Sequence, residues 1–184
     1  NYFREKNAYP GRARNIGVEK SKEEWIAFLD SKTVPRKYWL KNNFEKIINN
    51  KVDIVFGFTK YISETFKQKI IRAATFGSVG HETTPGTIIR KKDFLNNLKF
   101  NENARAGEDL EWRNRIKSKT LLKIDKNNEI TLSYYSLPNK ITSVVKKYLI
   151  YSFHSAYLDI QQNMKELYLT ILLFLTAIII PQWN

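Results

Sequence analysis

Apolar and polar positions along the first part of the chain predict strands and helices in turn. The apolar stretch Trp25–Leu29 predicts a short strand that ends at Asp30, and Lys51–Ile62 predicts a second strand. Arg12–Lys22 has a helix-compatible pattern. A further amphipathic helix is predicted after Pro35, where apolar residues recur at helical spacing: Tyr38, Leu40, Phe44, Ile47 and Ile48.

The next part of the chain continues this alternation with one exception. Ser63–Ala73 predicts a helix with Ser63 as its N-cap, because a serine hydroxyl can accept a hydrogen bond from the first turn. Ala74–Gly86 is rich in Gly, Ser and Thr and has no clear periodicity, so we expect a long loop with a functional role. The other predicted elements are strands at Thr87–Arg90, Leu121–Ile124 and Glu129–Tyr134, and helices at Lys92–Leu98 and Glu108–Ser118.

This order of elements predicts a fold class. Strands that alternate with helices indicate an α/β domain over residues 1–136, with a largely parallel sheet flanked by helices. Ligands on such sheets bind at the carboxyl ends of the strands. Asp30 follows the end of a predicted strand and is therefore a candidate site residue. From its position alone, a turn carboxylate or a helix N-cap explains Asp30 equally well.

The character of the chain changes after Pro138. Ile141–Met164 predicts a long helix, and Leu167–Ile180 is a run of fourteen residues without charge. That run is shorter than the ~20 residues that span a bilayer, so it is part of a span, an interfacial anchor or a buried core helix. Because it has no polar face, we expect a membrane-associated helical tail at residues 137–184. Neighbouring lysines suit an anionic cytoplasmic leaflet, which would place the catalytic domain in the cytoplasm.

The charge of the chain favours an anionic partner. Lys and Arg number 31 against 18 Asp and Glu, which gives a net charge of +13. Nucleic acid, anionic lipid and phosphorylated small molecules all fit this charge, as does a solvated basic surface without a specific role. A nucleic-acid-binding module is thus an alternative function, but the basic residues are spread out and no aromatic–basic cluster or zinc finger is visible. We therefore expect no nucleic acid among the partners.

The composition also restricts the metal chemistry. The chain has no Cys, which excludes disulfides and thiolate metal sites. His81 and His154 lie far apart without metal-ligand spacing around them, which argues against a zinc site. Any metal would be a hard divalent cation, Mg²⁺ or Mn²⁺, held by carboxylates and by substrate phosphates.

Two acidic segments carry a family resemblance. Gly11–Pro35 reads GRARNIGVEKSKEEWIAFLDSKTVP, and Gly107–Ile116 reads GEDLEWRNRI. In order and spacing they resemble family-2 glycosyltransferases of the GT-A fold, which have an Ala-Arg-Asn-x-Gly helix, a strand ending in a DxD-type motif, a Pro with an aromatic–Leu pair, and an acidic pair at the start of a helix. The matching residues are Ala13, Arg14, Asn15, Gly17, Asp30, Ser31, Lys32, Pro35, Trp39, Leu40, Glu108 and Asp109.

The resemblance implies an inverting enzyme that transfers a sugar from a nucleotide-sugar donor to the hydroxyl of a glycan or lipid-linked acceptor, in cell-envelope or surface glycan synthesis. It gives Asp109 the role of general base, with Glu108 beside it shaping the acceptor site. On the residues alone, acidic side chains in the first turn of a helix are explained by the helix dipole. The residues that the resemblance assigns to the donor are Arg14, Asn15, Asp30 and Lys32, with Asp30 as the metal ligand.

The sequence departs from the family pattern at Lys32, which stands where the motif usually has its direct metal ligand. An ammonium group cannot ligate a cation. Either Lys32 points away while Asp30 and the phosphates hold the metal, or its charge lies against the diphosphate and partly replaces the metal. A catalytically inactive homologue is a third interpretation. No nucleoside-binding strands are recognisable before Gly11, so the chain resembles the C-terminal part of such a catalytic domain.

Overall fold

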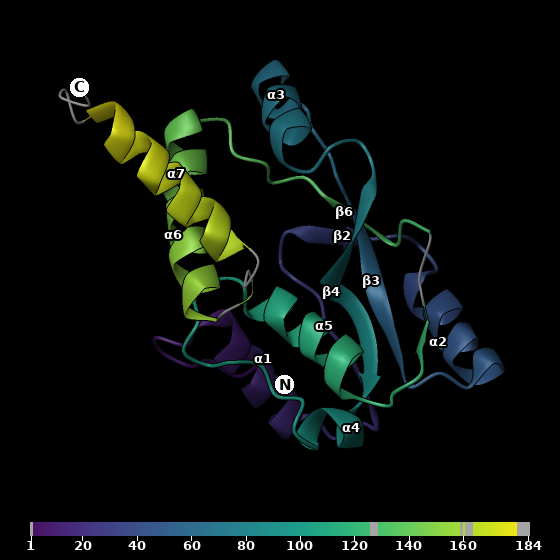
Figure 1. Cartoon of the computed structure of the whole chain (residues 1–184). Coiled ribbons are helices and arrows are strands. Elements are labelled where there is room, and N and C mark those ends of the chain that lie inside the picture. Colours follow the sequence, from purple (N-terminus) through teal and green to yellow (C-terminus); the bar gives the residue numbers. More distant parts are fainter. Residues whose placement is uncertain (1, 126–128, 159, 161–163, 180–184) are drawn as a thin grey trace.

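The computed structural model describes residues 2–125, 129–158, 160 and 164–179, and it shows a single sheet with helices on both faces (Figure 1). Its helices are α1 (Pro10–Lys20), α2 (Trp39–Asn50), α3 (Phe66–Thr75), α4 (Lys91–Leu95), α5 (Glu108–Lys119), α6 (Ile141–Tyr157) and α7 (Met164–Ile179). Its strands are β1 (Trp25–Ala27), β2 (Thr33–Pro35), β3 (Ile54–Tyr61), β4 (Gly80–Arg90), β5 (Ile124–Asp125) and β6 (Leu132–Tyr134).

The sheet is mixed, with strand order β1-β4-β3-β6-β2 and β5 paired to β3. β4 is antiparallel to both β1 and β3, and β2 is antiparallel to β6, whereas β3 is parallel to β5 and β6. The prediction of a largely parallel sheet was wrong, because β4 returns directly alongside β3 instead of crossing over to a parallel position. The α/β class with flanking helices is confirmed.

Alternating residues of the central strand β3 enter two separate cores. Ile54 and Phe56 lie in the core beneath α1, α4 and α5, whereas Val55 lies in the core beneath α2. Trp112 of α5 is fully buried in the first core, and its indole N–H donates to the carbonyl of Leu98. This packing holds α5 across the sheet and thereby fixes the position of the acidic residues at its N-terminus.

β4 occupies much of the segment that the sequence predicted to be a loop. Thr83, Thr84 and Thr87 are buried within it, and their hydroxyls are hydrogen-bonded. The Thr83 hydroxyl lies 2.7 Å from that of Thr59, and the Thr87 hydroxyl donates to the Thr83 carbonyl at 3.1 Å. Threonine suits a strand, and the buried hydroxyls find the partners they need on β3, within β4 and at the start of α5. The predicted loop is therefore wrong from Gly80 onward.

The start of α3 also differs from the prediction. Thr65 rather than Ser63 is the N-cap, because Thr65 forms a reciprocal capping box with Gln68. The Gln68 N–H donates to the Thr65 hydroxyl at 3.2 Å, and the Gln68 side-chain carbonyl accepts from the Thr65 N–H at 3.3 Å. Pro35 ends the edge strand β2, which the sequence did not predict and where a residue without an N–H is tolerated.

The C-terminal part contains two helices (Figure 1). α6 is shorter than the predicted helix, and the N–H of Leu158 closes its end on the His154 carbonyl at 2.9 Å. Among the described residues, no helix combines the length and apolar character that crossing a bilayer requires. The burial described for α7 does not fit a buried core helix, because six of its large apolar side chains are exposed: Leu169, Ile171, Leu172, Leu173, Phe174 and Leu175. The domain boundary at 136/137 stays a prediction.

Candidate active site

One cavity of 580 Å³ is lined by residues of both acidic motifs. It is bounded by α1, the turn between β1 and β2, the N-terminus of α5, β6 and α6. Of the residues that the resemblance assigned to a site, it is lined by Arg14, Asp30, Lys32, Glu108 and Asp109. The tertiary structure therefore brings the two motifs together, although they lie far apart in the sequence.

Arg14 of α1 joins the two motifs. Its Nη1 donates to Glu108 Oε1 at 2.8 Å, and its Nη2 donates to Asp30 Oδ1 at 3.1 Å. The guanidinium also lies 5.3 Å from the centre of the Phe100 ring, which supports it from the core side. Burial alone would lower the pKa of Arg14, but the negative charges of Asp30 and Glu108 outweigh burial and raise it. Arg14 is therefore a permanent cation that holds both carboxylates.

Glu108 is the most enclosed carboxylate of the cavity. Only 6% of its side chain is exposed, and its pKa is raised. Burial is the main cause and the negative charge of Asp109 the second, while Arg14 opposes both. The ion pair between Arg14 and Glu108 therefore raises the pKa of Arg14 but does not lower the pKa of Glu108. For the Glu108 carboxylate, the effect of burial is larger than the attraction to Arg14. Glu108 is better suited to hold Arg14 and shape the cavity than to act as a fully ionised ligand.

Asp109 lies in the first turn of α5, where the helix dipole favours negative charge. The preceding Gly107 has a φ of +81°, a left-handed conformation that favours glycine and turns the chain into the helix. Asp109 Oδ1 accepts a hydrogen bond from the Leu110 N–H at 2.8 Å, and the side chain lines the cavity. A carboxylate held in this way can accept a proton from a hydroxyl bound in the cavity.

Asp30 is the more exposed partner of Arg14, with 44% of its side chain accessible. Within the described part of the chain, no three Asp, Glu, His or Cys side chains are grouped to hold a metal ion by themselves. Mg²⁺, however, is commonly held by one or two carboxylates together with substrate phosphates. Asp30 fits a hard cation on those terms, with phosphate oxygen atoms completing the coordination. Lys32 lines the same cavity and brings a positive charge to it.

Asn15 lies outside the cavity. It is buried, and its amide bridges the loop before α5: Nδ2 donates to the Phe100 carbonyl at 3.0 Å and to Glu102 Oε1 at 2.9 Å. Its Oδ1 accepts from the Phe100 N–H at 2.9 Å. In this structure Asn15 positions α1 against that loop, and its assignment to the donor stays a prediction.

Three further charged or titratable residues form contacts outside the cavity. Arg113 donates to the carbonyl and the carboxylate of Glu82 on β4, at 2.7 and 3.3 Å. Arg115 pairs with Glu111 within α5 and caps backbone carbonyls of the preceding loop. His81 lies in β4 rather than in a loop, and its Nε2 bonds the Phe76 carbonyl. These contacts explain the residues as structural ones.

Sequence reasoning missed the aromatic wall of the cavity. Tyr134 of β6 and Tyr151 of α6 both line it. Burial, followed by the negative charges of Asp109 and Glu108, raises the pKa of Tyr151, so its phenol stays protonated at neutral pH. The available signal was the spacing of Lys147 and Tyr151, which places them on one face of a helix.

Comparison with known proteins identifies the family. The family model described as glycosyl transferase family 2 matches residues 2–115. The chain belongs to glycosyl transferase family 2. An uncharacterised glycosyltransferase of Rickettsia bellii is 30% identical over 207 aligned positions, which cover 96% of this chain and 27% of the relative. One of Methanocaldococcus jannaschii is 26% identical over 165 positions, covering 82% of this chain and 56% of the relative.

The fold agrees with this family. Staphylococcus aureus TarS, residues 1–349, solved in complex with UDP-GlcNAc, superposes with a TM-score of 0.52 at 18% identity, over 73% of this chain and 41% of TarS. The likeness concerns the fold, an α/β GT-A-like mixed sheet flanked by helices. The chain spans about a quarter to a half of the length of the curated relatives that it matches.

Proposed function

We propose that the complete protein is an inverting glycosyltransferase that moves a sugar from a nucleotide-sugar donor to a hydroxyl acceptor. Membership of family 2 supports the reaction class. The observation that carries the proposal is the bridge from Arg14 to Asp30 and Glu108, because it sets the two acidic motifs side by side in one cavity. TarS has been solved with UDP-GlcNAc, so a UDP-sugar is the first donor to test.

In the proposed reaction the acceptor oxygen attacks the anomeric carbon, the bond from that carbon to the diphosphate breaks, and the configuration inverts. Asp109 takes the proton of the acceptor hydroxyl. Glu108, held by Arg14, shapes the acceptor position beside it. The ammonium group of Lys32 faces the negative charge that develops on the diphosphate. A divalent cation held by Asp30 and the phosphates would stabilise the same leaving group.

We further propose that the protein works at the cytoplasmic face of a membrane, on a lipid-linked or surface glycan acceptor. An exposed apolar stripe on α6 supports this location, formed by residues at four-residue spacing: Ile141, Val145, Leu149 and Phe153. Together with the exposed apolar side chains of α7, it makes the kind of surface that marks an interaction site. The net charge of +13 suits anionic lipid.

Substitution of the proposed base tests the function. Asp109→Asn should lower sugar transfer by about 10²–10⁴-fold, because an amide cannot accept the acceptor proton. Glu111→Gln is the matched control: Glu111 lies in the same turn of α5 but pairs with Arg115 at 2.7 Å and does not line the cavity. Transfer of radiolabelled sugar should be measured on membranes that hold the complete protein.

The result has three distinct meanings. Activity of Asp109→Asn within about tenfold of the wild type would contradict the base assignment. Absence of transfer by the wild type with every nucleotide sugar would favour an inactive homologue. Salt-dependent binding of nucleic acid in place of transfer would favour the basic binding module.

A further inference from the structure

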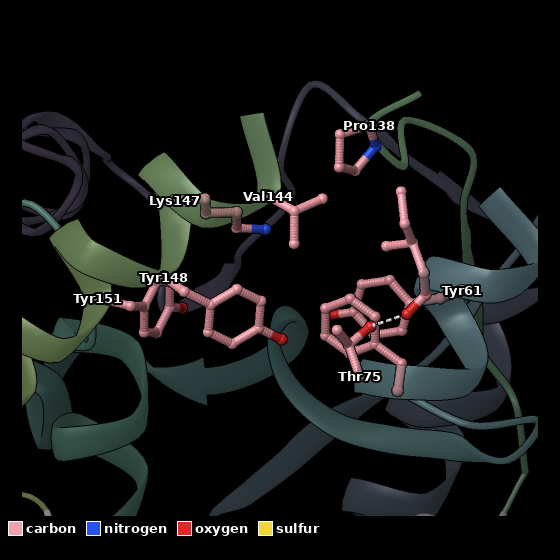
Figure 2. A pocket seen from close by; sticks show the side chains of 9 residues that line it. Tyr61, Thr75, Pro138, Val144, Lys147, Tyr148 and Tyr151 are labelled. Atoms are coloured by element: carbon pink, nitrogen blue, oxygen red, sulfur yellow. Dashed lines mark hydrogen bonds between the residues drawn. The ribbon is translucent and has the colours of Figure 1, made fainter. Parts of the chain in front are cut away.

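A second cavity lies beside the catalytic one, between α3, β3 and α6 (Figure 2). Its volume is 170 Å³, below the ~300–1,000 Å³ of pockets for drug-sized ligands, so it suits a single ring. Tyr151 lines both cavities, and they therefore share a wall. A ligand in the second cavity would lie next to the carboxylates of the first.

The walls of this cavity are aromatic. Tyr61 and Phe76 stack with ring centres 3.7 Å apart and planes 10° from parallel, which makes one flat wall. Figure 2 shows Tyr148 and Tyr151 entering from α6, across from Tyr61. Burial, then the charge of Asp109, raises the pKa of Tyr61 to about 12, so its hydroxyl stays a hydrogen-bond donor. Flat apolar walls with hydroxyl groups suit a ring that has an apolar face and polar edges, as a sugar ring has.

One positive charge faces these walls. Lys147 reaches into the cavity from α6, with its ammonium 5.9 Å from the centre of the Phe76 ring (Figure 2). Among the described residues, no carboxylate lies within 4.0 Å of it. Burial, then repulsion from Lys32, lowers its pKa, while Asp109 opposes the change. The cavity therefore offers an ammonium group without a fixed counter-ion, which favours an anionic ligand.

We propose that this second cavity is the acceptor subsite, and that the acceptor is a sugar or polyol ring that carries a phosphate. The ring lies between Tyr61 and Tyr148, and the phosphate pairs with Lys147. The inference rests on the proposed function, because it orients a ring hydroxyl past Tyr151 towards Asp109. A soluble sugar phosphate and the headgroup of a lipid both provide this chemistry.

Binding to two matched sugars tests the proposal. By calorimetry, glucose 6-phosphate should bind the protein about tenfold more tightly than glucose, because its phosphate adds a charge-assisted contact with Lys147. Lys147→Gln should remove this preference, and Lys147→Arg should retain it. Lys146→Gln is the control, because Lys146 is the adjacent lysine of α6 but does not line the cavity. Tyr148→Ser should weaken both sugars, which provides a second variant if Lys147→Gln does not fold.

Vesicles of phosphatidylcholine with and without phosphatidylinositol distinguish the sources of the phosphate. Sedimentation with phosphatidylinositol that depends on Lys147 would support a lipid-borne acceptor, and binding of glucose 6-phosphate alone would support a soluble one. Equal binding of glucose and glucose 6-phosphate, with no effect of Lys147→Gln on either probe or on vesicles, would overturn the proposal. The proposal would also be overturned if Lys147→Gln weakened the binding of UDP but changed the binding of neither sugar and of neither kind of vesicle. These experiments measure binding and not sugar transfer. Their outcome is therefore independent of the transfer assay with Asp109→Asn.

Discussion

At the scale of single residues, the two partners of Arg14 differ in their burial. Glu108 is 6% exposed in its side chain and Asp30 is 44% exposed. Removing one partner from a buried pair costs about 3–5 kcal/mol, whereas exposed pairs contribute roughly 0–1 kcal/mol. The pair with Glu108 therefore fixes α1 to α5. The pair with Asp30 is weak enough to be exchanged, so that Asp30 can bind a cation and Arg14 can bind a substrate phosphate.

Lys32 leads to a prediction about metal removal. Chelation of divalent cations should lower transfer several-fold without abolishing it, because the Lys32 ammonium supplies part of the positive charge that the diphosphate needs. In Lys32→Asp the remaining activity should depend fully on added Mg²⁺ or Mn²⁺. Transfer rates with chelator, and after addition of either ion, would measure both effects.

The control for this experiment is Lys37→Asp, which makes the same charge change outside the cavity. Complete loss of wild-type activity with chelator, restored by Mg²⁺ or Mn²⁺, would show that Lys32 does not replace the metal.

At the scale of elements, the start of α3 links the sheet to the segment before α6. Besides its capping box, Thr65 donates from its hydroxyl to Asn139 Oδ1 at 2.9 Å. Gln68 Nε2 donates to the Leu137 carbonyl at 2.7 Å. These bonds connect α3 to the segment that leads into α6, and both helices line the second cavity. The cap of α3 therefore helps to position Lys147 and Tyr148 of α6.

Removal of this cap should be measurable. Thr65→Ala should lower the free energy of unfolding by about 1 kcal/mol, the usual cost of losing an N-cap side chain. Ser63→Ala should change it little, because Ser63 is not the cap of α3. Urea unfolding followed by circular dichroism would compare the two variants. If both variants lost the same free energy of unfolding, the capping box of Thr65 would contribute nothing specific to stability.

At the scale of the whole molecule, α6 has one face that lines the cavities and another that is exposed and apolar. One face carries Lys147 and Tyr151 into the cavities. The apolar stripe containing Leu149 and Phe153 is exposed, at 67% and 71%. Because both faces belong to one helix, a membrane beneath the stripe would hold the acceptor subsite close to lipid. The α6 and α7 helices would then lie at the interface.

Vesicle binding tests this arrangement. Leu149→Ser combined with Phe153→Ser should lower sedimentation of the protein with vesicles of phosphatidylcholine and phosphatidylglycerol several-fold, since less apolar surface enters the interface. Raising the salt concentration should weaken the remaining binding, which depends on charge. Ile48→Ser, an exposed apolar residue of α2, is the control. Unchanged binding of the double variant would argue against contact through α6.

The sequence predicted much of the fold from local patterns. Helical spacing around Phe44 and Ile47 predicted α2, and the acidic pair Glu108 and Asp109 marked the start of α5. Such patterns are set by neighbours three or four residues apart, so they can be recognised in the chain itself. The order and spacing of the motifs in Gly11–Pro35 and Gly107–Ile116 likewise predicted the family that residues 2–115 match.

The tertiary structure decided what depends on residues far apart in the chain. Thr83 and Thr84 look like loop residues until folding places their hydroxyls against Thr59 of β3 and the Asp109 carbonyl. Arg14 looks like a free phosphate ligand until folding places it between two carboxylates. Tyr151, in the predicted tail, became part of the cavity wall because α6 packs beside it. The sequence by itself determined the local elements and motifs, whereas the partners of each polar group were decided only by long-range packing.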